Sequence, residues 1–549
     1  MSRRPDQKIY VKKVLEQVPR LIAQLDRNPF SPTYGCFDWN YWHDKIVDSP
    51  SAHTQENVLV LAYLYMNKLV DNPYYNNDKV KDWIIAAMLY WTQVQHRDGS
   101  FDEFYVNERQ LGATAITLYA VMKSFIMIKG KIAPEDAKRI LAAATRSARL
   151  LAKHDETHLL SNHQSQVIMA LLLVQKVTKV SFSKAIRSKL KRIITGQSKD
   201  GWFREYTGAD LGYLTTTIAF LAEYYLETKD RSLLDPLKQA VEFTGHFIYP
   251  DGTFGGVVGS RNTAHFWPSG FEMLDKAIGG KFPLAGAIAD KALEFMEAGS
   301  LLTPEKEDRY FGEQMYDLLW AFMNHSSRGS SAELPFEQKD FLRYFEDSRM
   351  LVVKKADRYA IISAGKGGIL KLFDIKKKRI VKSNCGLVGR LSDKTVVATN
   401  FNDETYKVKL ENDLIRISGR FHAVSFSNMS PFKMSVFKTG MLVLGRTMSL
   451  SNFIKDVIIK KLITGDRKVD ILFSRTIDLN FFKIEDEIVI KGGDKFRELS
   501  CLDESKLIFV AYSKYFNESE LGTRTKKIGE DEIEMLNTDK SVKLVYDNL

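Results

Sequence analysis

The feature that most constrains the fold of this chain is a short turn that recurs after helical segments. It occurs in QVQHRDGSFDEF (93–104), TGQSKDGWFREY (195–206) and HFIYPDGTFGGV (246–257). In each copy Asp-Gly supplies a positive-φ turn after a helix, and the aromatic residue two places later fills the space beside the adjoining helices. Because the motif repeats, Asp98, Asp200 and Asp251 are predicted to be turn residues rather than catalytic carboxylates.

Apolar residues recur at helical spacing through the first 330 residues, with few alternating stretches between them. The clearest helical patterns cover residues 9–26, 55–68, 80–95, 113–128, 134–153, 164–176, 214–228, 233–247, 284–297 and 312–324. Helix pairs joined by repeated loops on one face are typical of an (α/α) toroid, whose loop face is concave. We therefore predict that residues 1–330 form an (α/α) toroid, an incomplete barrel of helix hairpins, with a binding cleft on its loop face.

The pattern changes after the Ser/Gly-rich segment HSSRGSSAELP (325–335). Period-2 alternation between Gly, Asn and Asp turns then predicts short antiparallel strands. These stretches include MLVVKKADRYAIISAG, KLFDIKKKRIVKSN, TVVATNF, YKVKLENDLIRISGRF, KTGMLVLGRTM, KVDILFS, DEIVIKGG and KLIFVAYS. We predict a linker over 331–345 and an antiparallel β-sandwich over 346–549.

The charge balance favours an anionic partner. The chain has 79 Lys and Arg against 68 Asp and Glu, a net charge of +11, spread along the sequence. Nucleic acid, an acidic polysaccharide or a membrane surface would suit this charge, and so would an ordinary solvated surface. The final prediction is an acidic poly- or oligosaccharide without a nucleic-acid partner, and the sequence leaves the oligomeric state open.

The cysteines and the apolar runs predict the compartment. Cys36, Cys385 and Cys501 lie far apart and show no disulfide or zinc pattern. The amino terminus has no apolar segment typical of a secretion signal. The longest apolar run, Val167 to Val174, is far shorter than the ~20 residues of a membrane span. We expect a cytoplasmic protein without a membrane span.

The segment GGVVGSRNTAHFWPSGFE (255–272) concentrates the strongest candidate binding residues. It is too polar for a core and too aromatic for a plain linker. Arg261 beside Asn262 suits recognition of a carboxylate, with His265 nearby. Trp267 offers a flat face for a sugar ring, although buried aromatic residues are commoner than stacking platforms. Glu272 ends the segment and is also predicted to contact the ligand.

Two upstream segments supply further candidates. Asn162 and His163 open a helix on the loop face, where a histidine can exchange a proton near neutral pH. An N-cap asparagine beside a satisfied histidine would explain the same residues. The second segment, WFREYTGADLGYLTT (202–216), holds a carboxylate pair and two tyrosines at the mouth of a repeat loop. The candidates from this segment and from the first repeat loop are Glu205, Tyr206, Asp210, Tyr213, Asn107 and Glu108.

These residues, in this order and before a β-sandwich, resemble the heparinase II/III-like polysaccharide lyases and the related alginate lyases. The resemblance implies a toroid that carries the sugar cleft and β-elimination at a uronic acid. In that reaction the C5 proton is removed and the 4-linked oxygen leaves, so the carboxylate must be neutralised while negative charge develops.

The resemblance also implies individual roles. Asn162 and His163 would hold or neutralise the carboxylate, and His163 could act as a base. Tyr213 would be the catalytic tyrosine, as acid or as acid and base, with Tyr206 as the alternative. The carboxylate site would be completed by Arg261, His265 and Asn262.

One departure from the family concerns a metal. Many members carry a His-x-His-x-Asp-like segment in the β domain, whereas the comparable stretch here is ISAGKGGILKLFD (362–374). Its GKGG (365–368) is predicted to be a hairpin turn. We therefore predict no metal and no cofactor.

Two other functions remain open at this stage. A glycoside hydrolase on the same toroid would need two carboxylates flanking the bond, drawn from Glu108, Glu205, Asp210 and Glu272. A non-catalytic protein that binds an anionic glycan during surface-polysaccharide biosynthesis would need neither acid nor base.

Overall fold

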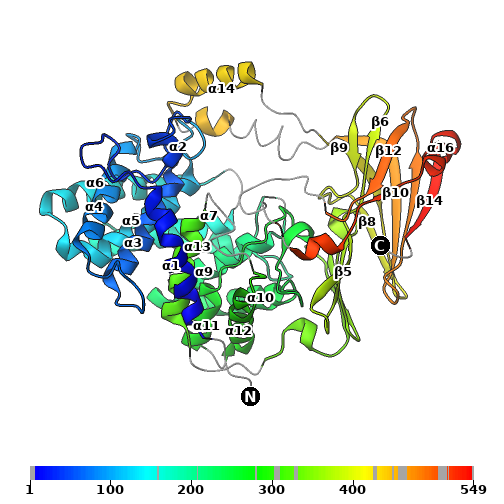
Figure 1. Cartoon of the computed structure of the whole chain (residues 1–549), viewed down its shortest axis with the longest axis horizontal. Helices are drawn as coiled ribbons and strands as arrows, with labels where there is room; N and C mark the ends of the chain where they lie inside the picture. The colour runs from blue at the N-terminus through cyan, green and yellow to red at the C-terminus, as the bar shows by residue number, and fades with distance from the viewer. Residues whose placement is uncertain are drawn as a thin grey trace.

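The polypeptide forms a helical half followed by a half made of antiparallel strands (Figure 1). The computed structural model describes residues 6–156, 160–206, 208–278, 281–301, 310–326, 332–424, 430–447, 450–454, 467–504, 516 and 518–546. In Figure 1 the helices of the first half lie beside the sheets of the second. This order confirms the predicted fold class.

Six inner helices form the toroid, each packed against the next, and α13 also packs against α3. They are α3 (Asn57–Met66), α5 (Leu111–Ile128), α7 (Ser161–Thr178), α9 (Leu211–Thr228), α11 (Ser269–Ile278) and α13 (Phe311–Asn324). The inner helices are buried along most of their length, because they have neighbours on all sides. Sequence periodicity had not predicted α11, whose segment was interpreted as a loop.

The outer helices bury only one face against the inner ring. They are α1 (Lys8–Ala23), α4 (Asp78–Val94), α6 (Pro134–Lys153), α8 (Ser183–Thr195), α10 (Leu234–Gly245) and α12 (Pro283–Glu297). Short elements connect the hairpins: α2 (Trp39–Trp42), η1 (Ala52–Glu56), η2 (Lys129–Lys131), η3 (Arg231–Leu233) and η4 (Gly256–Val258). The alternation of inner and outer helices confirms the toroid of helix hairpins.

One stretch, Leu111–Lys131, is long and apolar enough to cross a membrane by length and composition alone. It contains the inner helix α5, and 83% of its apolar window is buried inside the protein. A core helix of the toroid passes the same test, because its neighbours cover it on all sides.

The repeated Asp-Gly motifs make the turns that were predicted. Gly99 and Gly252 have φ angles of 97° and 83°. Asp98 Oδ1 accepts a hydrogen bond from the Ser100 backbone N–H at 3.0 Å, and Asp251 Oδ1 accepts one from Thr253 at 3.0 Å. In the second copy, the Asp200 side chain accepts from the Ser348 N–H at 2.8 Å, which joins this turn to the β half.

The β half contains two antiparallel sheets. The five-stranded sheet follows chain order: β1 (Phe341–Phe345), β2 (Met350–Lys355), β3 (Arg358–Ser363), β4 (Ile369–Asp374) and β5 (Arg379–Asn384). β1 pairs with β2 from Phe341↔Lys354 to Phe345↔Met350, so the sheet begins inside the predicted linker 331–345. The linker prediction is corrected here, because pairing across the turn after Phe345 draws these residues into the sheet.

The second sheet has the strand order β13-β12-β6-β7-β9-β10-β11-β14, and β8 pairs with β9. Its strands are β6 (Leu387–Leu391), β7 (Val396–Ala398), β8 (Lys407–Glu411), β9 (Leu414–Val424), β10 (Lys468–Asp478), β11 (Ile484–Ile490), β12 (Phe496–Cys501), β13 (Lys526–Lys527) and β14 (Ser541–Tyr546). The helix α16 (Glu530–Asp539) packs against β12 and β14. The predicted strand KLIFVAYS (506–513) lies outside the described residues.

The central strands of the five-stranded sheet are buried on both faces. On β2, Met350 and Val352 belong to the core cluster shared with the toroid. Leu351 and Val353, which alternate with them, belong to the core cluster shared with the second sheet. Side chains on a strand alternate between faces, so the layers run from toroid to first sheet to second sheet.

A helical arm leaves the β half between β9 and β10. This arm, α14 (Pro431–Leu444), lies above the helices of the toroid in Figure 1. Lys438 forms an ion pair with Asp48 at 2.7 Å, and the ring of Phe437 lies 4.9 Å from that of Tyr105. The prediction of a strand over KTGMLVLGRTM was therefore wrong for Lys438 to Leu444, because these residues pack on the toroid as a helix.

Candidate active site

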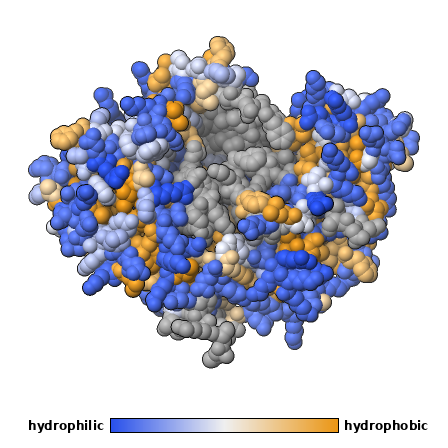
Figure 2. All heavy atoms as spheres, viewed as in Figure 1, coloured by the Kyte–Doolittle hydropathy of each residue, from blue (hydrophilic) through white to orange (hydrophobic). Residues whose placement is uncertain are grey.

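The amino-terminal ends of the inner helices meet at one end of the toroid. His163 in the first turn of α7 lies against Gly112 at the start of α5. The ring of His265 lies in the same way against Gly212 at the start of α9. Helix amino termini carry partial positive charge, so this end of the toroid favours anionic groups. Figure 2 shows that hydrophilic residues cover most of the visible surface of both halves, with apolar residues between them.

Arg261 is the central residue of the site. Its Nε donates to Asp210 Oδ2 at 2.7 Å, and its Nη2 donates to Glu205 Oε2 at 2.8 Å. All three side chains are buried. The two carboxylates raise the pKa of Arg261 although burial lowers it, so the guanidinium stays charged. Protein carboxylates hold Nε and Nη2 in place, and a contact of Arg261 with a sugar carboxylate stays a prediction.

Two tyrosines and a histidine surround this guanidinium. Arg261 Cζ lies 4.6 Å from the Tyr213 ring centroid and 5.4 Å from that of Tyr206. The ring of His265 meets Tyr213 edge to face, with centroids 4.9 Å apart. Burial raises the pKa of Tyr213 well above its usual value, although the charge of Arg261 opposes this. Both predicted catalytic tyrosines are therefore in the site, and Tyr213 lies closer to Arg261.

The backbone around Tyr213 is fixed by Asp210. Asp210 is the N-cap of α9 and accepts from the Tyr213 N–H at 3.0 Å. The Thr263 hydroxyl donates to Asp210 Oδ1 at 2.5 Å and accepts from the Gly212 N–H at 3.0 Å. A Cβ on Gly212 would lie 2.5 Å from the ring of His265, so only glycine leaves space for this histidine. Asp210 thus positions both the helix start and Arg261.

His265 is buried and uncharged. Its Nε2 lies 3.2 Å from the Thr216 hydroxyl. Burial lowers the pKa of His265 to about 3, and the nearby charge of Arg261 lowers it further while Asp210 opposes the shift. A neutral imidazole at this place supports the Tyr213 ring rather than supplying a positive charge for a carboxylate.

Asn162 joins the site through Glu205. Its backbone N–H and its Nδ2 donate to the two oxygens of Glu205 at 3.0 and 2.8 Å. Asn162 is 1% exposed, and its Oδ1 has no hydrogen-bond partner among the described residues. Burial raises the pKa of Glu205, which Arg261 and Asn162 counteract. The predicted Glu205 is thus an internal charge partner, and Asn162 presents an unused acceptor.

His163 is paired with a carboxylate that the sequence analysis did not select. Its Nδ1 lies 2.9 and 3.0 Å from the two oxygens of Glu156. Burial alone would lower the pKa of His163, but the charge and hydrogen bond of Glu156 raise it above its usual value. Because a carboxylate only accepts, Nδ1 carries the proton and Nε2 is the basic nitrogen of neutral His163. Glu156 was detectable only as a carboxylate in the polar loop before the helix.

Lys366 lies in the stretch 362–374, which contains no histidine. Its Nζ donates to Val257 O at 2.6 Å, Gly259 O at 2.9 Å and Asn262 Oδ1 at 2.7 Å. Burial lowers the pKa of Lys366 to about 8. An ammonium group with three oxygen partners leaves no ligand set for a cation, so the described residues here do not fit the β-domain metal of the family. Asn262 accordingly supports the loop that carries Arg261.

Trp267 and Glu272 lie in the core rather than in the cleft. Trp267 is 2% exposed and packs against the rings of Phe220 and Tyr316. Glu272 is fully buried and accepts from the Tyr10 hydroxyl at 3.1 Å, while its Oε1 lies 3.0 Å from His325 Nδ1. Both predicted ligand contacts are corrected, because Trp267 is buried just before α11 and Glu272 is buried in the first turn of that helix.

Asn107 and Glu108 hold the α14 arm. The Asn107 side chain donates to Met441 O at 3.2 Å, and Ser451 donates to Glu108 O at 2.6 Å. The Glu108 carboxylate accepts from the backbone N–H of Glu103 and Phe104 at 3.0 and 2.7 Å. Their predicted sugar-binding role is corrected to a structural one, because these groups order their own loop and its contact with the arm.

Comparison with known proteins relates part of the chain to a known family. Residues 52–270 match the family model of the ulvan lyase N-terminal domain, and this range contains the site residues from Glu156 to His265. Over this range the chain is similar to the polysaccharide lyases. The predicted resemblance and the predicted enzyme class, a polysaccharide lyase, are confirmed. No curated protein matches the sequence.

Solved structures of polysaccharide lyases share the fold. The chondroitin AC lyase of Streptomyces coelicolor A3, in complex with chondroitin sulphate, has a TM-score of 0.50 and 9% identity, covering 91% of this chain and 72% of its own. A heparinase III has a TM-score of 0.40 and 11% identity, covering 91% and 81%. A mutant heparan sulfate lyase of Pedobacter heparinus has a TM-score of 0.42 and 10% identity, covering 91% and 71%. The first of these supports the toroid with a β domain.

Proposed function

We propose that this polysaccharide lyase cleaves a uronate-containing poly- or oligosaccharide by β-elimination. The observation that carries the proposal is the contact network from Asn162 through Glu205 and Arg261 to Tyr213. This network brings a hydrogen-bond acceptor, a tyrosine and the His163–Glu156 pair to the end of the toroid where helix amino termini meet. An acidic sugar is the substrate class that the net charge of +11 favours.

His163 is the proposed base. With Nδ1 donating to Glu156, the lone pair of Nε2 is left to accept the C5 proton. Glu156 also raises the pKa of His163, which strengthens it as a base once it is deprotonated. A carboxylate that orients the imidazole of a catalytic base is a recurrent arrangement in enzymes.

Tyr213 is the proposed acid. Its raised pKa keeps the phenol protonated at neutral pH, so it can donate to the glycosidic oxygen as that oxygen leaves. Stacking of the Arg261 guanidinium on its ring stabilises the negative charge that develops on the phenol oxygen. This contact favours Tyr213 over Tyr206, which lies farther from Arg261.

Asn162 is the proposed partner of the sugar carboxyl group. Its buried Oδ1 is an acceptor, so it matches the O–H of a protonated carboxyl group. A neutral carboxyl group lowers the cost of removing the C5 proton, because the carbanion can delocalise into it. This assignment replaces the earlier one to Arg261, whose Nε and Nη2 bind Asp210 and Glu205.

The steps then balance. The C5–H bond breaks and its proton goes to His163 Nε2. The electron pair forms the C4=C5 double bond, and the C4–O bond breaks. The departing oxygen takes the phenol proton of Tyr213. Proton return from His163 to Tyr213 through solvent restores the site, and the product is an unsaturated uronide.

A glycoside hydrolase is less well supported by the same contacts. Hydrolysis needs two carboxylates on opposite sides of the scissile bond. Glu205 and Asp210 both bind one guanidinium, and Glu108 and Glu272 bind groups of the protein itself. These four candidates are therefore occupied in maintaining the fold.

The test is ultraviolet detection of unsaturated uronides after incubation with a panel of uronate polymers, including ulvan, chondroitin sulfate and heparan sulfate. Tyr213→Phe should lower kcat/KM by about 10²–10⁴-fold, because it removes the acid. Tyr225→Phe is the matched control, since it changes a tyrosine of the same helix outside the site. New reducing ends without the uronide absorbance would point to hydrolysis, and no signal from any polymer would refute the proposal.

A further inference from the structure

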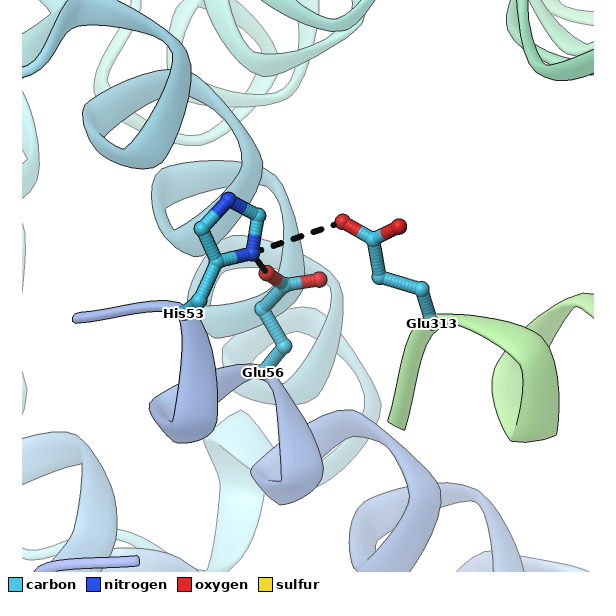
Figure 3. A group of neighbouring side chains, drawn as sticks. All are labelled: His53, Glu56 and Glu313. Carbon is cyan, nitrogen blue, oxygen red and sulfur yellow. Dashed lines mark ion pairs between the residues drawn. The ribbon is translucent and has the colours of Figure 1, made fainter. Parts of the chain in front are cut away.

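A second cluster of chemically capable side chains lies outside the proposed site. It consists of His53 from η1, Glu56 at the start of α3, Glu103 from the first repeat loop and Glu313 from the first turn of α13. We call these four residues the His53 cluster. Figure 3 shows the His53 ring facing the carboxylates of Glu56 and Glu313.

The distances within the cluster are short and the polar atoms are unusually bare. His53 Nδ1 lies 2.5 Å from Glu56 Oε1 and 3.5 Å from Glu313 Oε1. One ligand atom from each of these three residues lies within 4.8 Å of the others. Glu56 is 1% exposed, yet neither its Oε1 nor His53 Nδ1 has a partner with hydrogen-bond geometry among the described residues. A protonated imidazole satisfies this pair as an ion pair, and a metal ion held by the same side chains would satisfy it equally.

The charge of the cluster also favours a cation. Three carboxylates surround one imidazole, so the ionised cluster is negative even when the imidazole is protonated. Glu56 and Glu313 lie at helix amino termini, where the helix dipole stabilises carboxylate anions. A proton or a metal ion would relieve the repulsion among these carboxylates.

Neighbouring tyrosines hold the carboxylates in place. The Tyr310 hydroxyl donates to Glu103 Oε1 at 2.8 Å, and the Tyr316 hydroxyl donates to Glu56 Oε2 at 3.3 Å. Tyr310 also packs edge to face on the His53 ring, with centroids 4.9 Å apart. In metal sites, hydrogen bonds of this kind orient the side chains that bind the ion.

We propose that His53, Glu56 and Glu313 bind a divalent transition-metal ion of the Zn²⁺ type, with Glu103 as a further ligand or hydrogen-bond partner. One imidazole nitrogen with carboxylate oxygens suits Zn²⁺, whereas Ca²⁺ and Mg²⁺ prefer oxygen ligands alone. Ligand atoms around tetrahedral Zn²⁺ lie roughly 3.3 Å apart. The gap of 2.5 Å between His53 and Glu56 must therefore widen by a side-chain rotation when the ion binds.

The ion would join the beginning of the toroid to its end. η1 and α3 come from the first hairpin, while α13 is the last inner helix, and these elements are in contact. A metal there would stabilise the closure between α3 and α13. The site is distinct from the β-domain stretch that Lys366 fills, and it does not depend on the lyase mechanism proposed above.

The experiment measures metal content and binding in the full-length chain. After removal of metal with a chelator, wild-type protein is titrated with Zn²⁺, Mn²⁺, Mg²⁺ and Ca²⁺ by calorimetry, and retained metal is counted by mass spectrometry. We expect one equivalent of Zn²⁺, release of protons on binding, and a higher Tm in the loaded protein. Failure of the wild type to retain one equivalent of Zn²⁺, or tighter binding of Ca²⁺ or Mg²⁺ than of Zn²⁺, would overturn the proposal.

Two variants locate the ion. Glu313→Gln and His53→Gln should each weaken Zn²⁺ binding at least about tenfold, with circular dichroism reporting whether they fold. Glu135→Gln and His43→Gln are the controls, because they change the same residue types on the exposed surface. If one cluster variant does not fold, the other decides the question. Binding that survives in a folded cluster variant as in its control would refute the assignment, whatever the enzyme activity.

Discussion

Two histidines of this protein occupy equivalent places and have opposite properties. Each lies against the glycine of a Leu-Gly pair that begins an inner helix, His163 against Gly112 and His265 against Gly212. His163 is partly exposed and binds the Glu156 carboxylate, which raises its pKa. His265 is fully buried near the Arg261 charge, and its pKa falls to about 3.

The comparison shows that the Leu-Gly helix start, although repeated, does not determine whether the histidine packed against it can carry a proton. The glycine only provides space for an imidazole. The nearest charge and the access of water then decide whether that imidazole can carry a proton. In this protein one copy holds His163, the candidate base. The other holds the uncharged His265, whose ring packs against Tyr213.

The largest expected effect comes from removing the first histidine. His163→Gln should lower kcat/KM for uronide formation by about 10²–10⁴-fold, because the proposed base is lost while the fold is kept. The measurement is initial rate on the best uronate polymer together with the unfolding midpoint. His43→Gln is the control, since His43 also pairs with a carboxylate but lies on the surface. Full activity in His163→Gln would remove it from the mechanism.

His265 should affect the pH dependence of the free energy of unfolding rather than the catalysed reaction. Because the pKa of His265 is lowered to about 3, its contribution to the free energy of unfolding is present above pH 6.5 and is lost as pH falls toward 3. The loss should reach about 2 kcal/mol between pH 7 and pH 5. Denaturant unfolding at both pH values measures it, and His265→Gln should show a smaller pH dependence. For His163 the sign is opposite, since its raised pKa gives stability below pH 6.5 that is lost as pH rises.

The two glycines offer a matched pair of substitutions. Gly212→Ala would place a Cβ 2.5 Å from the buried ring of His265 and should cost about 1–3 kcal/mol of unfolding free energy. Gly112→Ala would place a Cβ 2.7 Å from the His163 ring, which can turn toward solvent, so it should cost less stability and more activity. Chemical denaturation and initial rates on the two variants test this, and equal costs would contradict the difference in burial.

The smallest effect is a displacement of the pH profile. Glu156→Gln removes the charge that raises the pKa of His163, so the acidic limb of kcat/KM should move to lower pH. Glu135→Gln, on the exposed face of α6, serves as the control. An unchanged limb would mean that His163 is not the group whose deprotonation limits the rate.

Much of the fold followed from local patterns in the sequence. The Asp-Gly turns at Asp98 and Asp251 and most inner helices were predicted, because turn chemistry and helical periodicity are local properties. The α14 arm was missed, since its packing partners Asp48 and Tyr105 are remote in sequence. The start of α11 was missed for the same reason, and Trp267 and Glu272 were therefore assigned to the cleft.

The sequence predicted which segments form the candidate site better than it predicted the role of each residue. The sequence located Asn162, His163, Tyr213 and Arg261 in segments that the structure brings into one network. It did not predict that Arg261 would form ion pairs with Asp210 and Glu205, because pairing between buried charges depends on the tertiary structure. Lys366 lies in the predicted turn between β3 and β4, but its burial was not predicted, since nothing local distinguishes an exposed lysine from one buried beneath a loop.

The α14 arm makes the two halves of this protein poor candidates for separate modules. The chain leaves the second sheet after β9, contacts the toroid, and returns to begin β10. Residues near the middle of the β half therefore complete a loop of the toroid by bonding Asn107, Glu108 and Arg109. Recombination at the junction near residue 340 would exchange a sheet and also a piece of the helical surface. Each half is therefore constrained by its contacts with the other.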